Sequence, residues 1–148
     1  MPELPEVETV VRDLRAAGLV GRRIVRSRVF WPKTVAAQAA TRFTREIRGL
    51  AINNLSRRGK FVVIELSKGR TLLIHLRMSG HLEVRRSGTS PRRHDRAILT
   101  LDDGREVCFE DTRKFGRIWL VHDPDKILKT LGPEPLAISA ADFTAGLA

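Results

Sequence analysis

Cysteine is almost missing from this sequence, because Cys108 is the only one among 148 residues. One cysteine cannot form a disulfide within the chain and cannot supply a cysteine-rich zinc site, so both are excluded. Glycine and proline are also modest in number, at 11 and 7, and 42% of the residues are hydrophobic. This composition is typical of a globular domain and excludes a disordered chain, and the length suits one domain with a substantial core.

Long apolar runs are absent as well. No stretch approaches the roughly 18 consecutive apolar residues of a membrane-spanning helix. The chain begins MPELPE, which is acidic and lacks the basic and then apolar order of a signal peptide. The sequence therefore predicts a cytoplasmic protein with no membrane partner.

Acidic residues are outnumbered, at 17 against 27 lysines and arginines, which gives a net charge of +10. The imbalance is local: from Arg22 to Lys60 there are eleven basic residues and one acid, Glu46. A second basic cluster comprises Arg85, Arg86, Arg92, Arg93 and Arg96. Two interpretations stay open from charge alone: a surface that follows the phosphates of a nucleic acid, or a solvated arginine-rich surface.

The apolar pattern predicts a helix first and short strands after it. Within residues 5–17, Val7, Val10, Val11 and Leu14 have the spacing of one helical face, and Gly18 suits a C-terminal stop. Eight short segments rich in β-branched or large apolar residues follow, at 24–30, 51–57, 61–66, 71–76, 81–84, 97–101, 106–110 and 117–121. Glycine-containing turns at 67–70 and 102–104 predict hairpins.

These elements predict an α+β, mainly β fold: a two-layer antiparallel β-sandwich flanked by the N-terminal helix and short helices. We expect the short helices within 36–45 and at 125–131. A Gly-Pro-Glu-Pro segment at 132–135 then marks a hinge or linker. The predicted boundaries are a β-sandwich domain over 1–131 and a hinge with the start of a further domain over 132–148.

The N-terminus offers candidate chemistry. If Met1 is removed, Pro2 has a free secondary amine, and an α-amine has a pKa of roughly 8, so a useful fraction is a neutral nucleophile at pH 7. Attack on an aldehyde-level carbon gives an iminium ion, and Glu3 is placed to move protons beside it. The alternative is an ordinary Met-Pro start with acids that favour the positive end of a helix.

Six segments together resemble the formamidopyrimidine-DNA glycosylase family, which also contains the endonuclease VIII-type enzymes. They are MPELPEVET at 1–9, RRGKF at 57–61, HLRMSG at 75–80, RHDR at 93–96, DTRKFG at 111–116 and LGPEPL at 131–136. Arg77 stands where the family usually has glycine, and Thr112 where it usually has proline. Leu4 and the VET spelling at 7–9 favour the formamidopyrimidine branch.

The resemblance implies a bifunctional glycosylase and AP lyase that removes oxidised purines, such as 8-oxoguanine and formamidopyrimidines, from double-stranded DNA. Pro2 is expected to form the Schiff base, Glu3 to shuttle protons, and Lys60 to reach the phosphate and sugar before β,δ-elimination. Glu6 is a further candidate acid in the same site.

The resemblance also assigns DNA contacts. Phe115 is expected to wedge between bases, Met78 to fill the void left by the extruded base, and Arg113 to bond the orphaned cytosine. His94 is expected to contact backbone phosphates. A wedge must be apolar and a cytosine reader must carry donors, so the residue types suit these tasks.

Each of these residues has a simpler interpretation. Met78 and Phe115 suit core positions, although polar neighbours and flanking glycines oppose that. Arg113 can pair with Asp111 in an exposed ion pair, and Lys60 can be an edge residue of a strand. His75 and Cys108 are expected to be buried, as a core histidine and a small hydrophobe.

The family's enzymes continue with a helix–two-turn–helix domain and usually a four-cysteine zinc finger. The sequence holds no Cys-x-x-Cys pair, so we expect an isolated, monomeric catalytic domain of a bacterial cytosolic enzyme, without zinc or another cofactor in this chain. Such a domain is expected to bind duplex DNA weakly and to turn over slowly. Two other hypotheses stay open: a non-catalytic basic module that binds nucleic acid, and a structural domain with no preference for polyanions.

Overall fold

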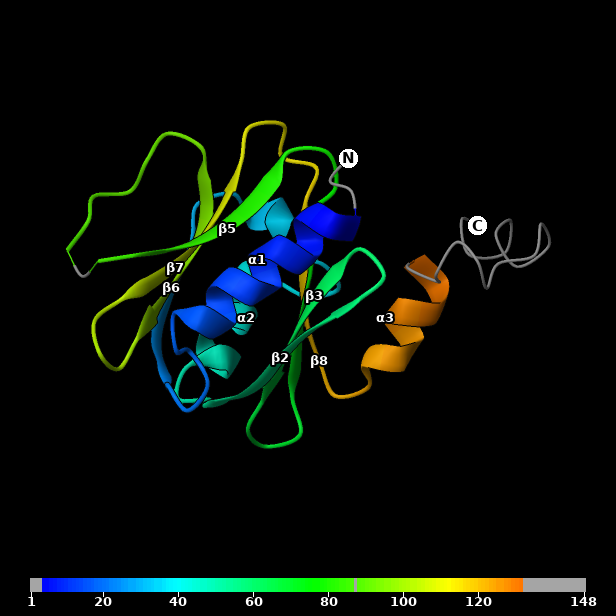
Figure 1. The fold of residues 1–148 in the computed structure, drawn as a ribbon, viewed down its shortest axis with the longest axis horizontal. Helices are drawn as coiled ribbons and strands as arrows, with labels where there is room; N and C mark the ends of the chain where they lie inside the picture. The colour runs from blue at the N-terminus through cyan, green and yellow to red at the C-terminus, as the bar shows by residue number, and fades with distance from the viewer. Residues whose placement is uncertain (1–3, 87, 132–148) are drawn as a thin grey trace.

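Two four-stranded antiparallel sheets form the body of the protein (Figure 1). The computed structural model describes residues 4–86 and 88–131. The first sheet has the order β1-β6-β7-β5, and the second has the order β2-β3-β4-β8. Their bounds are β1 Ile24–Val29, β2 Ile52–Arg58, β3 Phe61–Leu66, β4 Thr71–His75, β5 Gly80–Arg85, β6 Asp95–Leu101, β7 Glu106–Asp111 and β8 Arg117–Val121. The predicted β-sandwich is confirmed, including its hairpins at 67–70 and 102–104.

Helices cover the two open edges of this sandwich. Helix α1 (Leu4–Ala16) contacts β2, β3 and β5, so it lies where the β5 edge of one sheet faces the β2 edge of the other. Helix α2 (Ala40–Ile47) contacts β1, and the short helix η1 (Pro32–Thr34) contacts β8, at the opposite pair of edges. Figure 1 shows α1 across the front of the sandwich and α2 behind it. Among the described residues, no helix is long and apolar enough to cross a membrane.

The core lies between the sheets and includes the apolar faces of both helices. Val7, Val10, Val11 and Leu14 are all buried, as the helical spacing predicts. Phe43 and Ile47 of α2 enter the same cluster from the other edge. Full burial of each such side chain stabilises the fold by about 1.5–3 kcal/mol, so α1 is held by its packing as well as by its own hydrogen bonds.

A second, smaller apolar cluster covers the outer face of the second sheet. Phe61, Val63, Leu73 and Trp119 form it with Leu128 of α3 (Pro124–Leu131). Strand β4 is therefore buried at every position. The predicted hinge at 132–135 and the rest of the chain to 148 lie outside the described residues, as do Met1, Pro2, Glu3 and Ser87.

Two connections pass from one sheet to the other at the same end of the sandwich. The β4–β5 loop leaves the second sheet and enters the first, and the β7–β8 loop runs the opposite way. They lie side by side because β5 pairs with β7, with Gly80 opposite Asp111, and β4 pairs with β8, with His75 opposite Arg117. These crossing loops carry three of the four predicted DNA contacts, Met78, Arg113 and Phe115, whereas His94 precedes β6.

Candidate nucleic-acid interface

The crossing loops expose two large apolar side chains. Met78 in the β4–β5 loop is 50% exposed, and Phe115 in the β7–β8 loop is 48% exposed. Neither is therefore a core residue, which was the simpler interpretation of both. Together with Arg77 and Arg117 they line a surface pocket of about 330 Å³. The two loops thus present apolar groups surrounded by arginines.

One buried carboxylate ties the loops together. Asp111 is completely buried, and its Oδ1 accepts a hydrogen bond from the Ser79 hydroxyl of the neighbouring loop. Oδ1 also accepts the backbone N–H of Arg113 at 3.1 Å, and Oδ2 accepts the backbone N–H of Gly116 at 2.6 Å. Hydrogen bonds to a charged acceptor are stronger than neutral ones, so this side chain fixes both loops relative to each other.

Glycine is required where the loops meet the sheets. A Cβ at Gly116 would lie 2.3 Å from the Cζ of Phe109 and 2.9 Å from the Oδ2 of Asp111. A Cβ at Gly80 would lie 2.4 Å from the backbone oxygen of Leu76. Real Cβ atoms do not approach other atoms this closely, so a side chain at either position would distort the loop that carries it.

Arg113 reaches across to the other loop. Its guanidinium lies 3.6 Å from the sulfur of Met78, whereas only its backbone N–H bonds to Asp111. Within the described residues Arg113 and Asp111 form no ion pair, and the side chain of Arg113 is exposed. Met78 lies 35 residues before Arg113 in the sequence, and the pair of loops brings it together with Arg113 and Phe115.

Arg77 occupies a left-handed backbone conformation, with φ of 52°. Side chains other than glycine pay about 1–2 kcal/mol in this region, which explains why glycine suits this position in the family that the sequence resembles. The backbone N–H of Arg77 donates to the Nδ1 of His75 at 3.1 Å. Here an arginine adopts the strained conformation and adds a positive charge beside Met78.

His75 is a buried residue beneath the loops, as predicted. Its ring packs edge-on against Phe61, with centroids 4.8 Å apart. Burial, followed by the charges of Arg77 and Lys60, lowers the pKa of His75 from 6.5 to about 4. The ring is therefore neutral near pH 7 and accepts the Arg77 N–H.

Lys60 lies in the tight turn between β2 and β3 and is half-buried. Its charge contributes to the lowered pKa of His75, which places it near the base of the loops. The preceding strand is tied to α1, because the Nε of Arg57 lies 3.2 Å from the Oε1 of Glu8. Lys60 is thus at the end of the sandwich where α1 begins, and not within the edge of a strand.

The beginning of α1 lies at this same end. Figure 1 shows it close to the beginning of β5, with which α1 is in contact. Glu6 is exposed in the first turn of the helix. Pro2 and Glu3 lie outside the described residues, so the structure places Glu6 and Lys60 but not the two residues with the central predicted roles.

Two arginines of the second basic cluster make structural contacts. Arg85 is buried and forms a two-point ion pair with Asp95, with N–O distances of 2.6 and 2.9 Å. Burial alone raises the pKa of Asp95, but the hydrogen bonds from Arg85 and from the Arg92 N–H outweigh it, and the pKa lies below its usual value. Arg96 donates to the backbone oxygen of Asp111 at 2.8 Å. These contacts show that Arg85 and Arg96 are structural.

His94 is held next to the crossing loops by a backbone hydrogen bond to Asp111. It precedes Asp95 directly, is partly exposed, and its backbone oxygen accepts the N–H of Asp111 at 3.0 Å. His94 therefore stands beside the crossing loops, at the same end as Lys60 and Met78. Sequence reasoning did not identify the contact of Asp111 with Ser79, 32 residues away, or the Arg85–Asp95 pair, 10 residues apart.

Trp31 supports the β7–β8 loop from the side. The Nζ of Lys114 lies 4.3 Å from the centroid of the Trp31 ring, a cation–π contact. Lys114 itself has a left-handed backbone, with φ of 61°, and its backbone oxygen accepts a hydrogen bond from Arg117 at 2.8 Å. The loop that carries Arg113 and Phe115 is thereby braced on two sides. Within residues 4–86 and 88–131, no group of three or more His, Cys, Asp or Glu residues could hold a metal ion.

Comparisons with known proteins agree on one family. A family model described as the formamidopyrimidine-DNA glycosylase N-terminal domain matches residues 1–118. The formamidopyrimidine-DNA glycosylase of Protochlamydia amoebophila is 42% identical over 139 residues, which cover 94% of this chain and 50% of that protein. The enzyme of Chloroflexus aurantiacus is 45% identical over 147 residues, which cover 97% of this chain and 51% of that protein.

Solved structures give the same answer for the fold. The Lactococcus lactis enzyme in complex with DNA containing FAPY-dG matches with a TM-score of 0.79 and 32% identity, over 90% of this chain and 51% of that one. Its complex with DNA containing an abasic site matches with a TM-score of 0.80 and 32% identity over the same shares. This chain spans about half the length of the curated relatives it matches.

Proposed function

The chain belongs to the formamidopyrimidine-DNA glycosylase family, and we propose that it carries the catalytic N-terminal domain of a DNA repair glycosylase and AP lyase. The proposed substrate is duplex DNA with an oxidised purine or an abasic site. One observation carries the proposal: Met78, Arg113 and Phe115 meet on two loops that Asp111 ties together, at the end of the sandwich where α1 begins.

These loops suit the extrusion of a base. An enzyme cannot reach the sugar carbon C1′ while the base is stacked, and extrusion costs a few kcal/mol. The exposed ring of Phe115 can enter the stack as an apolar wedge, and Met78 can fill the space that the base leaves. The guanidinium of Arg113, next to Met78, offers donors to the acceptor edge of the unpaired cytosine.

The chemistry then belongs to the N-terminus. With Met1 removed, the Pro2 amine attacks C1′, the bond from C1′ to the base breaks, and the base leaves with that electron pair and gains a proton. Glu3 protonates the ring oxygen as the sugar opens, which leaves an iminium ion between Pro2 and C1′. The iminium acidifies the proton on C2′. Loss of that proton expels the 3′-phosphate, and a second elimination expels the 5′-phosphate.

Positive charge around the loops holds the strand during these steps. Lys60 and His94 are placed at the same end as the crossing loops, where a phosphate on either side of the lesion would lie. Glu6, exposed in the first turn of α1, is a second candidate proton carrier beside Glu3. Arg77 adds one more cation at the rim of the pocket.

Borohydride trapping tests this proposal directly. Protein in excess over duplex DNA with one abasic site, in the presence of borohydride, is expected to give a covalent protein–DNA band, because the reductant converts the iminium to a stable amine. Intact mass first establishes that Met1 is absent, since a retained Met1 would make the Pro2 nitrogen an amide. The matched control carries one extra residue ahead of Pro2, which removes the free proline amine without altering the fold.

The outcomes separate the hypotheses. A band that disappears in the extended control supports catalysis by Pro2. A band that survives the extension would assign the amine to another residue and overturn the role of Pro2. If protein that lacks Met1 binds DNA in a salt-dependent way but gives no band, the non-catalytic binding module is favoured instead.

A further inference from the structure

We propose that a groove between β1 and α2 is a second surface for the backbone of nucleic acid, separate from the crossing loops. This groove, called here the β1–α2 groove, has a volume of about 470 Å³ and is lined by Val25, Arg26, Ser27, Thr44, Arg45 and Arg48. That the ligand is DNA rests on the proposed function, whereas the groove itself is independent of it.

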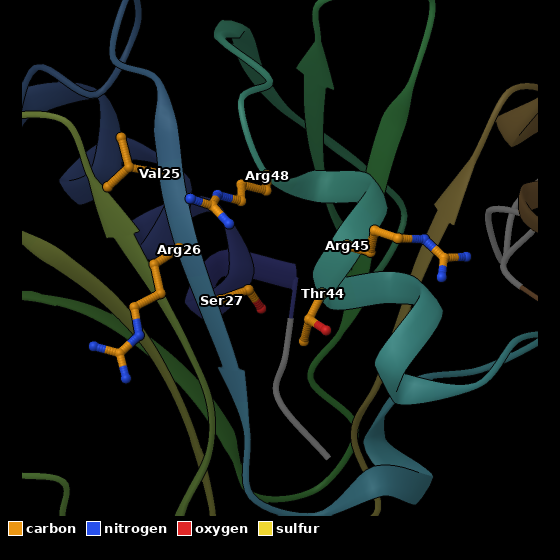
Figure 2. Close-up of a pocket in the computed structure, with 6 residues that line it drawn as sticks. All are labelled: Val25, Arg26, Ser27, Thr44, Arg45 and Arg48. Atoms are coloured by element: carbon orange, nitrogen blue, oxygen red, sulfur yellow. The ribbon is translucent and has the colours of Figure 1, made fainter.

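The arginines of the groove are spread along it. Figure 2 shows the guanidinium of Arg48 between β1 and α2, whereas the guanidinium of Arg26 points outward past β1 and that of Arg45 points outward past α2. A compact anion would need the three groups to converge on one point. Separated guanidinium groups instead match a chain of phosphates, each able to accept two hydrogen bonds from one arginine.

The positive charge of the groove is not neutralised by the protein. The acids on this side of the molecule are already paired, Glu46 with Arg42 and Arg70, Glu106 with Arg28, and Asp102 with Arg22. Hydrogen bonds from Arg42 and Arg70 hold the pKa of Glu46 below its usual value, so Glu46 remains their anionic partner. Within the described part of the chain, Arg26, Arg45 and Arg48 have no ion pair. Three cations without an ion pair therefore lie in and beside this one groove.

Two simpler explanations account for only part of this arrangement. Strand β1 is an edge strand, and charged residues on edge strands prevent pairing with other chains, which explains Arg26. Cations near the C-terminal end of a helix interact favourably with its dipole, which explains Arg45 in the last turn of α2. Neither effect requires Arg26, Arg45 and Arg48 to line the same groove. A shared anionic ligand explains all three.

The position of the groove makes it a separate contact. Helix α2 covers the sandwich edge opposite the one that α1 covers, so the groove does not share the side on which α1 lies. Its lining includes none of the residues assigned to base extrusion or catalysis. Nucleic acid bound there would be held without reference to its sequence or to a lesion, because phosphate contacts carry no sequence information.

The test compares two variants with the same net charge. The groove variant carries Arg26→Gln, Arg45→Gln and Arg48→Gln. The control variant carries Arg12→Gln, Lys68→Gln and Lys129→Gln, three exposed cations on α1, the β3–β4 turn and α3. Binding of each to an intact, lesion-free duplex is measured from 50 to 200 mM salt, with circular dichroism to confirm folding.

The slope of log K against log salt concentration becomes shallower by about 0.9 for each phosphate contact that is removed. We therefore expect the slope of the groove variant to be shallower by about 2.7, for three contacts. The change in affinity between 50 and 200 mM salt then shrinks by about 40-fold relative to the unsubstituted chain. The control variant should show a much smaller change. Equal slopes for the two variants would overturn the inference, because net charge alone would then explain the binding.

Two further arms identify the ligand and separate this inference from the proposed function. Binding of vesicles with anionic lipid, lost in the groove variant while DNA binding is unchanged, would overturn the assignment to nucleic acid. Borohydride trapping with saturating abasic DNA should be the same in both variants. A failure of trapping in every protein would count against the proposed function, and a reduced salt slope would still support the groove.

Discussion

Replacing Asp111 with asparagine should lower the free energy of unfolding by about 2–3 kcal/mol, although the side chain hardly changes in size. The carboxylate receives donors on both oxygens, from Ser79 and the Arg113 N–H on one and from the Gly116 N–H on the other. In either orientation of an amide, its NH₂ group must face one of these donors. A hydrogen bond to a charged acceptor contributes about 1.5–3 kcal/mol, and a buried unsatisfied donor costs about 1–3 kcal/mol, although these two terms are not additive.

Urea unfolding measures this loss as a lower midpoint at an unchanged slope. Asp123→Asn is the matched control, because Asp123 is exposed and accepts a single backbone N–H, from Asp125 at 3.2 Å. That substitution should change the free energy of unfolding by less than about 0.5 kcal/mol. If Asp111→Asn and Asp123→Asn had the same midpoint, the buried carboxylate would not be the tie between the loops, and the reasoning would be refuted.

Three other predictions concern single side chains. Arg77→Gly should raise the free energy of unfolding by up to about 1 kcal/mol in a urea titration, because glycine adopts the φ of 52° without strain, and should lower the salt slope of DNA binding by about 0.9. A loss of stability would contradict the strain argument. The pKa of His75 is 6.5 in the unfolded chain and about 4 in the folded protein. Folding therefore favours the neutral ring, and the full contribution is present above pH 6.5. The free energy of unfolding should fall by about 3 kcal/mol as the pH is lowered from 6.5 to 4. His75→Gln should lack this part of the pH dependence, and identical pH profiles would exclude His75 as its source. Burial raises the pKa of Cys108 to about 11, so iodoacetamide at pH 8 should label it only after denaturation, as mass spectrometry would show.

Local patterns in the sequence were sufficient for most of the fold. Four apolar residues at helical spacing defined α1, and the predicted strands at 61–66 and 117–121 have the observed bounds. The second helix was predicted within 36–45 but extends over Ala40–Ile47. The difference arises from tertiary contacts: Val35 bridges to Ile118 and Ala37 has φ of 69°, so the chain cannot yet be helical, while Ile47 extends the helix by entering the core.

Less of the candidate site could be predicted from the sequence. The exposure of Met78 and Phe115 could be anticipated from their polar neighbours and flanking glycines, and the structure confirms it. The Arg85–Asp95 pair could not be anticipated, because a basic cluster in sequence gives no sign of which arginine is buried. The same holds for Asp111, whose side-chain partners come from two different loops.

The crossing of the loops between the sheets has a mechanical consequence. A side chain that is pushed into a stack of bases experiences an equal force in the opposite direction, and the tip of an isolated hairpin would bend under it. Phe115 and Met78 are instead carried by two short spans, each anchored at both ends in different layers of the sandwich and joined in the middle through Asp111. A force on the exposed ring of Phe115, such as the proposed insertion between bases would exert, is therefore shared by β4, β5, β7 and β8.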